Sequence, residues 1–227
     1  EGACSGVLTW MLLRRFLLFQ LLALNGCDQP SRHASAPLDW TLTTAPLSGE
    51  WVDAEMEGTG AVGLHDAVIA LATGRPMTGI RFDGWDGAGL PLLDYAVSYE
   101  TRRVAGRDFF GTLTFPVGSL DRCVSLVIGG WGGAVVGISS IDDADAGGNE
   151  TRSEQVFQDG QWYRVRIEVR SDDIRAFIDD RIVVNVNIKG RRLGLRAGEI
   201  QKCAPFGFAS YATEGEVRKV RVERLRD

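Results

Sequence analysis

One short segment constrains the fold more than any other part of the chain. Between Tyr163 and Val169, apolar side chains occupy every second position and charged ones fill the positions between them. Such alternation with period two is typical of an antiparallel strand that buries one face and exposes the other to water. The same pattern returns at residues 182–188 and near Val220 and Val222. Helical periodicity does not recur after residue 39, so the sequence predicts an all-β fold with very little helix.

Further apolar runs are also predicted to be strands, and Gly, Asp and Asn residues separate them at short intervals. These runs are residues 51–57, 67–73, 94–102, 109–115, 123–128, 134–139, 174–179 and 206–212. Strands at such spacing, with no helix between them, favour a sandwich or jelly roll of two antiparallel sheets over a parallel α/β sheet. We expect residues 40–227 to form this single β-sandwich domain.

The first 27 residues differ from the rest of the chain. After Met11, two arginines precede an apolar stretch at residues 16–24, and small residues lead to Cys27. This order of charged, apolar and small residues is typical of a secretory signal, and residues 24–27 resemble the lipobox of bacterial lipoproteins. We therefore expect residues 1–27 to be upstream residues plus a lipoprotein signal peptide, with Cys27 as the lipidation site. A short buried helix is the alternative.

Residues 28–39 are rich in Pro, Ser and Ala, which indicates a flexible tether. An exported, lipid-anchored chain would lie in the cell envelope, outside the cytoplasm, and would contact a membrane only through its anchor. Export also permits a disulfide between Cys123 and Cys203. Two buried free thiols are the other interpretation, because each Cys lies in an apolar, strand-like segment.

Charge and composition exclude several classes of function. The chain has 25 Lys and Arg against 30 Asp and Glu, a net charge of -5 and no basic stripe, so we expect no nucleic-acid partner. No Gly-rich phosphate loop precedes a helix, which argues against a nucleotide ligand. The two histidines are His33, in the predicted tether, and His65, at a predicted hairpin turn. A His-based catalytic triad or a multi-His zinc site is therefore not expected.

Two neighbouring segments resemble a known fold family. Residues 160–169 open with Gly-Gln-Trp and continue as the alternating strand described above, and residues 174–183 contain Asp179 and Asp180 at a predicted tight turn. The pair resembles the concanavalin A-like and laminin-G-like jelly roll, in which an Asp-Gly turn joins the two later strands. A primed turn needs left-handed backbone, which Asp tolerates better than most residues.

Later segments extend this resemblance. Gly194-Leu-Arg, Pro205-Phe-Gly-Phe-Ala and the closing strand at residues 217–225 are similar to the end of the bacterial 3-keto-disaccharide hydrolase domain. The resemblance spans residues 51–225 and implies a concanavalin A-like jelly-roll sandwich. It also implies action on an oligosaccharide or keto-glycoside, where elimination and water addition need one base and one electrophilic group.

Two predicted strands supply the candidate catalytic and binding face. Strand geometry sets Glu100 and Arg102 on one face of the first strand, and Thr112 and Thr114 on one face of the second. Paired side by side, these strands would form a patch of carboxylate, guanidinium and hydroxyl groups suited to a sugar. The other interpretation is an exposed cross-strand ion pair of little energetic weight.

The loop after residue 139 is rich in oxygen-bearing side chains. Asp142, Asp145, Asn149 and Glu150 lie close together in the sequence and form a candidate calcium site, because calcium takes about six to eight oxygens. The other interpretation is a solvated acidic turn. Since glycoside hydrolysis needs two carboxylates, one of them held protonated, Asp142 or Asp145 is also the predicted partner of Glu100. Arg102 is the predicted electrophilic group.

Two tryptophans flanked by glycine are candidate sugar-binding residues. They are Trp131, in Gly129-Gly-Trp-Gly-Gly133, and Trp85, in Gly84-Trp-Asp-Gly87. An indole without bulky neighbours can project from a loop and stack on the apolar face of a pyranose. The alternative is a buried indole that packs closely against a bulged strand. Trp162 is assigned to the core.

Two functions from different classes follow from these observations. The first is an exported lipoprotein whose domain is an enzyme of the 3-keto-disaccharide hydrolase type. The alternative is a non-catalytic, laminin-G-like carbohydrate-binding or adhesion module, and an interaction domain without a sugar ligand is a third interpretation. A deep cluster of Glu100, Arg102 and a loop carboxylate favours the enzyme, whereas a shallow face with exposed Trp131 favours the binding module.

Overall fold

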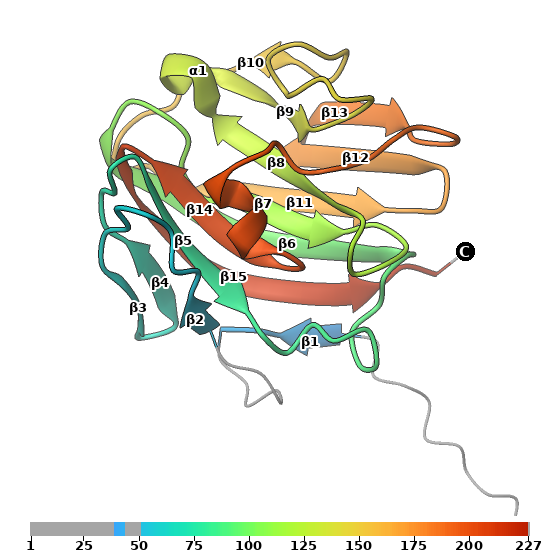
Figure 1. Ribbon diagram of the computed structural model, residues 1–227, viewed down its shortest axis with the longest axis horizontal. Coiled ribbons are helices and arrows are strands. Elements are labelled where there is room, and N and C mark those ends of the chain that lie inside the picture. Colours follow the sequence, from blue (N-terminus) through green and yellow to red (C-terminus); the bar gives the residue numbers. More distant parts are fainter. Residues whose placement is uncertain (1–38, 44–50, 227) are drawn as a thin grey trace, which may run out of the picture. The chain divides into compact units, whose positions relative to one another are not determined.

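The alternation of apolar and polar side chains produces two antiparallel sheets, as the sequence predicts. The structure, a computed structural model, describes residues 39–43 and 51–226. The predicted signal peptide, its lipidation site Cys27 and residues 28–38 of the predicted tether lie outside the described residues. Figure 1 shows the two sheets as stacked layers, with α1 and the loops at their edges.

The larger sheet has eight strands in the described residues. In spatial order they are β13 (Arg181–Asn187), β12 (Asp173–Ile178), β11 (Tyr163–Val169), β6 (Tyr95–Gly106), β15 (Thr213–Arg224), β4 (Val68–Leu71) and β3 (Val62–His65), with β1 (Asp39–Thr41) paired to β15. The smaller sheet has seven strands in the same part of the chain: β10 (Ser153–Glu154), β9 (Val135–Ser139), β8 (Cys123–Gly129), β7 (Thr112–Pro116), β14 (Gly207–Tyr211), β5 (Met77–Phe82) and β2 (Trp51–Asp53).

Helix in the described residues is limited to the short turn α1 (Gly130–Gly133) and the 3-10 helix η1 (Glu199–Cys203). The predicted all-β jelly roll with very little helix is therefore confirmed. Neither of these segments, nor any other helix in the described ranges, has the length and apolar character needed to cross a lipid bilayer.

The core lies between the sheets and consists of the inward-facing side chains of both. Strand β11 buries every second residue from Tyr163 to Val169, as predicted. The smaller sheet contributes Leu113, Leu126 and Phe208 to the same cluster. Removing a side chain of this kind from water contributes roughly 1.5–3 kcal/mol, so this packing holds the two sheets together.

Some hairpin turns use left-handed backbone at residues other than glycine. Asp179 and Asp180 join β12 to β13 with φ angles of 47° and 66°, which confirms the predicted primed turn. Asp66 and Ala67 join β3 to β4 in the same way, with φ angles of 52° and 62°. His65 ends β3 at this turn and is exposed, as predicted.

The connection between β6 and β7 changes sheets, so the predicted pairing of these two strands is wrong. Strand β6 pairs with β11 and β15, whereas β7 pairs with β8 and β14 in the other sheet. Gly106 and Gly111 in the connection have positive φ, and a Cβ at Gly111 would lie 2.0 Å from Thr101 Oγ1. Glycine has no Cβ, and this lets the chain turn closely against its own strand.

Two predictions about tryptophan are also wrong. Trp85 is 2% exposed and stacks on Phe206 with ring centroids 4.4 Å apart, so it belongs to the core and not to a ligand site. Trp162, predicted in the core, is half-buried on the outer face of the larger sheet. Its ring lies 4.7 Å from the guanidinium of Arg102 and 3.9 Å from that of Arg218, a stacking that stabilises an indole outside the core.

Cys123 and Cys203 are buried free thiols, so the second interpretation of these cysteines is the one observed. Cys203, the last residue of η1, packs with Met56, Met77 and Ala209. Burial raises the pKa of both thiols to about 12. Because the thiolate is the reactive form, both residues are unreactive at neutral pH.

Candidate functional site

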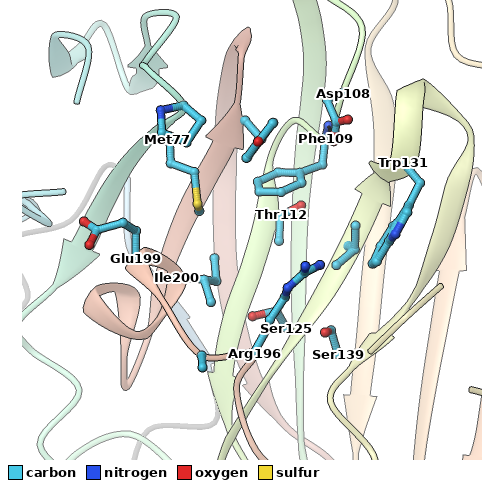
Figure 2. A pocket seen from close by; sticks show the side chains of 14 residues that line it. Met77, Asp108, Phe109, Thr112, Ser125, Trp131, Ser139, Arg196, Glu199 and Ile200 are labelled. Carbon is cyan, nitrogen blue, oxygen red and sulfur yellow. Dashed lines mark hydrogen bonds between the residues drawn. The ribbon is translucent and has the colours of Figure 1, made fainter. Parts of the chain in front are cut away.

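The outer face of the smaller sheet carries a cleft with a volume of about 420 Å³. Sites for small molecules span about 300–1,000 Å³, so this one is at the small end. Figure 2 looks into the cleft, which is lined by residues from strands of this sheet, from α1, from η1 and from the loops before β7 and after β13. Of the residues predicted from the sequence, Thr112 and Trp131 line the cleft.

Small, outward-facing residues form the floor of the cleft. Neighbours of the core residues along each strand necessarily face outward. The strand register aligns Gly207, Thr114, Ser125 and Ser139 in one row across β14, β7, β8 and β9. Thr112 lies beside Ala209 in the adjacent row. Of these residues, Thr112, Ser125 and Ser139 line the cleft together with Val127. None of the four is larger than valine, and this leaves room above this part of the sheet for a ligand.

Hydroxyl groups give the floor its hydrogen-bonding capacity. Thr112, Ser125 and Ser139 line the cleft, and each is less than 5% exposed to solvent. Thr114 lies next to them, and its Oγ1 is 2.9 Å from Ser125 Oγ, an interaction that orients the Ser125 hydroxyl. A hydroxyl both donates and accepts hydrogen bonds, so a fixed row of hydroxyls is suited to a ligand that itself carries hydroxyls.

Trp131 borders the cleft and is 46% exposed. Its backbone is left-handed, with φ 50° and ψ 49°, a conformation that is rare for bulky residues and is concentrated at functional sites. The Gly132 amide donates to Asp108 Oδ2 over 3.0 Å and holds this turn. A Cβ at Gly147 would lie 2.8 Å from Trp131 Cε2, so glycine is needed for the indole to lie against that loop. The projecting indole is therefore the interpretation that the structure supports.

An apolar wall closes the side of the cleft opposite Trp131. Phe109 and Tyr211 pack with ring centroids 5.6 Å apart, and Met77 and Ile200 line the cleft near them. Figure 2 places Met77 and Ile200 across the cleft from Trp131, with Phe109 between the two sides. This wall was not predictable from the sequence, because Met77, Phe109, Ile200 and Tyr211 belong to separate elements that only the fold brings together.

A strap of residues 191–197 forms a third side of the cleft. The Ser140 amide donates to the Gly194 carbonyl over 2.6 Å, and the Gly194 amide donates back to Ser140 over 3.2 Å. Arg196, which lines the cleft, projects from this strap, and its guanidinium lies 5.9 Å from the Trp131 ring. The strap therefore places a positive charge beside the exposed indole.

The acidic loop after β9 holds the strap in place. Asp142 and Glu150 both pair with Arg191, and the Glu150 pair measures 2.6 Å. Asp145 pairs with Arg196 at 3.2 Å. The richness of this loop in carboxylates is thus explained by the arginines of the strap.

The predicted calcium site at Asp142, Asp145, Asn149 and Glu150 is wrong. The three carboxylates bind arginines, and the Asn149 side-chain amide donates to two backbone carbonyls. The Arg192 amide and the Arg191 guanidinium lower the pKa of Asp142, so this group is also unsuited to the role of a protonated acid. Within residues 39–43 and 51–226, no three His, Cys, Asp or Glu side chains converge as metal ligands.

Two carboxylates, Asp108 and Glu199, line the cleft in the described residues. Asp108 accepts hydrogen bonds from two backbone amides. Glu199 pairs with Lys202 at 2.9 Å and accepts from the Glu57 amide over 2.7 Å. The Lys202 ammonium and the Glu57 amide lower the pKa of Glu199, so this carboxyl is ionised at neutral pH.

Glu100 and Arg102 lie on the outer face of the larger sheet, away from the cleft. The Glu100 carboxylate accepts hydrogen bonds from Arg218 Nε and Lys219 Nζ, each over 2.7 Å. A bulge in β15, with Lys219 at φ 56°, brings both cations to this one carboxylate. Arg102 pairs with Glu216 at 2.7 Å. A cross-strand ion pair, the second interpretation of these residues, is therefore observed. The Glu100 side chain is only 16% exposed and has two cationic partners, so this pair is less exposed and stronger than that interpretation expected.

The predicted catalytic and binding patch is consequently not formed. Glu100 and Arg102 lie in the larger sheet, whereas Thr112 and Thr114 lie in the smaller one. Asp142, the predicted partner of Glu100, follows β9 in the smaller sheet. Glu100 and Arg102 instead pair with residues of β15, and Asp142 pairs with Arg191 of the strap.

Comparisons with known proteins support the fold. No protein family and no curated protein matches this sequence. Among solved structures, the chain is similar to the Crh5 transglycosylase, both apo and in complex with NAG, with 12% identity, a TM-score of 0.55 and coverage of 85% of this chain and 86% of that chain. It is also similar to the carbohydrate binding module CBM66 from Bacillus subtilis, with 12% identity, a TM-score of 0.49 and coverage of 76% and 94%.

The similarity to the Crh5 transglycosylase and the topology of the two sheets place the chain in a class defined by its fold, the concanavalin A-like jelly-roll sandwich of two antiparallel sheets. At 12% identity this similarity carries no information about particular residues. The function must be argued from the cleft itself.

The ion pairs of Glu100 predict a stability that depends on pH. Burial opposes ionisation of Glu100, but hydrogen bonds from Lys219 and Arg218 outweigh it, and the pKa of Glu100 falls below its ordinary value of 4.5. Glu100→Gln should lower the free energy of unfolding by about 1–2 kcal/mol at pH 7, because hydrogen bonds to a charged group are lost. The difference should shrink below about pH 4, since a group with a depressed pKa loses its contribution as pH falls through that pKa.

Urea unfolding at pH 7 and at pH 3 measures this difference. Glu154→Gln is the control, because Glu154 pairs with Arg152 at an exposed position, and it should change the free energy of unfolding by less than about 0.5 kcal/mol. Equal effects of the two substitutions would contradict the stabilising role of Glu100.

Proposed function

We propose that the cleft binds a carbohydrate and that the described domain is a carbohydrate-binding jelly roll. The observation that carries this proposal is the exposed indole of Trp131, held in left-handed backbone beside a floor of fixed hydroxyl groups. A sugar ring has an apolar face of C–H groups and a rim of hydroxyls. An indole complements the first and the hydroxyls of Thr112, Ser125 and Ser139 complement the second.

The shape of the cleft favours a short ligand. Figure 2 shows labelled side chains around it: Met77 and Glu199 on one side, Trp131 on the other and Asp108 at one end, with Arg196 reaching toward the middle from the opposite end. A volume of about 420 Å³ is in the lower part of the range for small-molecule sites. The proposed ligand is therefore one or two sugar units, free or at the end of a glycan.

Binding without catalysis is the function that the charges in the cleft favour. Hydrolysis of a glycoside with a carboxyl acid requires one carboxyl that stays protonated. Glu199 has a lowered pKa, and Asp108 accepts two hydrogen bonds from backbone amides. Both are arranged as structural acceptors.

A second candidate function is the enzyme implied by the resemblance to 3-keto-disaccharide hydrolases. One observation favours it: Asp108 and Arg196 both line the cleft. In this candidate Asp108 removes the acidic proton beside the keto group, and Arg196 stabilises the negative charge that develops on the carbonyl oxygen.

The proposal includes a place in the cell. The pattern of residues 11–27 is that of an exported lipoprotein, and the proposed localisation is the cell envelope with an anchor at Cys27. Residues 28–38 then serve as the tether that holds the domain away from the membrane. A domain that binds glycans at the cell surface accords with this location.

Removal of the Trp131 indole should abolish most of the affinity. Trp131→Ala should weaken binding by at least about tenfold, because the stacking surface for the sugar is lost and tenfold corresponds to about 1.4 kcal/mol. Isothermal titration with cellobiose, maltose, N,N′-diacetylchitobiose and L-fucose measures this effect on whichever probes bind the wild type. Trp162→Ala, on the other sheet, is the matched control and should keep wild-type affinity. Failure of all four probes, or equal losses in both variants, would refute the proposal.

Turnover of a keto sugar decides between the two candidate functions. If the protein is an enzyme of this type, Asp108→Asn should lower kcat on 3-keto-trehalose by at least about 100-fold with little change in binding, because a general base is lost. Asp83→Asn, at an exposed ion pair with Arg81, should leave the rate unchanged. Product analysis by chromatography measures the rate, and a wild-type protein that binds the sugar without turnover eliminates the enzyme.

Lipidation of Cys27 is tested by phase partitioning of the full chain made in a bacterium. The wild type should enter the detergent phase and carry acyl chains at Cys27 in peptide mass spectra, because several acyl chains anchor stably. Cys27→Ser should move the protein to the aqueous phase, whereas Cys123→Ser, at a buried thiol, should not. Wild-type protein without acyl groups would overturn the proposed anchor.

A further inference from the structure

The two sides of the cleft differ in chemistry. The side toward β8, β9 and the strap presents Ser125, Ser139 and Arg196, all of which form hydrogen bonds. The side toward β5 and η1 presents the aliphatic surfaces of Pro76, Met77 and Ile200. Figure 2 shows Met77 and Ile200 together on this side, separated from Ser139 by the floor of the cleft.

Glu199 is a charged residue on the aliphatic side, but it does not make this side polar toward a ligand. Glu199 is engaged by Lys202 at 2.9 Å and by the Glu57 amide at 2.7 Å. Lys202 in turn donates to the Glu55 carbonyl over 2.7 Å. Both contacts to Glu199 are made at its Oε2 atom. Figure 2 shows the Glu199 carboxylate turned away from Met77 and Ile200, so it leaves their aliphatic surfaces facing the cleft.

A buried cluster supports the aliphatic wall. Met77 packs with Ala54, Met56, Cys203 and Ala209 in this cluster, and Ile200 packs against it. The side chains of Pro76, Met77 and Ile200 carry no hydrogen-bonding group stronger than the weak thioether acceptor of Met77, whereas Tyr211, which lines the cleft near them, carries a phenolic hydroxyl. The aliphatic surface is therefore limited to those three residues.

Such a wall is a poor surface for an unsubstituted sugar. A ring whose positions all carry hydroxyls would place at least one hydroxyl against Met77 and Ile200, and a hydroxyl that loses its water without gaining a new partner weakens binding. Aliphatic side chains also cannot stack on the ring as an indole does. A methyl group at the same place would gain favourable burial.

From this we infer that the cleft selects sugars that carry a methyl group, placed against Met77 and Ile200 while the ring stacks on Trp131. The inference rests on the proposed carbohydrate-binding function. Two sugar classes have this chemistry: N-acetylated amino sugars, through the acetamido methyl, and 6-deoxy sugars, through C6. The hydroxyl-rich side of the cleft then binds the polar edge of the ring.

Matched pairs of sugars test the selectivity directly. Isothermal titration compares N,N′-diacetylchitobiose with cellobiose, and L-fucose with L-galactose, which differs from it by one oxygen. In at least one pair the methylated member should bind about tenfold more tightly, and the pair that shows the preference identifies the class. Equal affinities within both pairs would overturn the inference and leave carbohydrate binding intact. Absence of binding by all four sugars and by maltose would overturn both.

Substitutions at the wall test its role. Ile200→Ser should reduce the preference for the methylated sugar to about twofold or less, whereas Ile200→Val should keep most of it. Ile182→Ser is the matched control, because Ile182 lies 52% exposed in β13 of the other sheet. Circular dichroism checks that the variants fold. The comparison of sugars on the wild-type protein tests the inference even if a variant does not fold. A full preference in folded Ile200→Ser would overturn the inference.

Discussion

Packing of two apolar sheet faces against each other decides which side chains this protein can present to a ligand. Successive residues of a strand point to opposite faces, so each residue that enters the core places its neighbours outside. Leu113 and Leu126 belong to the core, and Thr112, Thr114 and Ser125 consequently lie together on the outer face. The hydroxyl floor of the cleft therefore follows from the same packing that stabilises the fold.

The sides of the cleft have a different origin from its floor. They come from connections: α1 carries Trp131, the strap carries Arg196, and η1 carries Ile200. Each connection is fixed by its own local means, with Gly147 beneath the indole, Asp145 paired with the strap and a buried cluster beneath η1. A regular scaffold with variable loops at one face is a common arrangement for binding sites.

Local features of the fold were predictable from the sequence, but long-range pairings were not. Alternation located β11, and the Asp179-Asp180 pair located a left-handed turn, because both depend only on neighbouring residues. Strand β5 was missed because its residues are buried on both faces and show no alternation. The separation of β6 from β7 depends on which strands pair across the whole chain. All four of Trp131, Thr112, Ile200 and Tyr211 line the cleft. Trp131 and Thr112 were predicted from local patterns, whereas Ile200 and Tyr211 reach the cleft only through long-range pairing.

The two buried thiols have a consequence for how this protein can be made and kept. Neither Cys123 nor Cys203 is cross-linked, so in residues 39–43 and 51–226 no disulfide contributes to stability. The described part of the sandwich is held by its core packing, its hydrogen bonds and its ion pairs. A reducing agent therefore breaks no covalent bond within these residues.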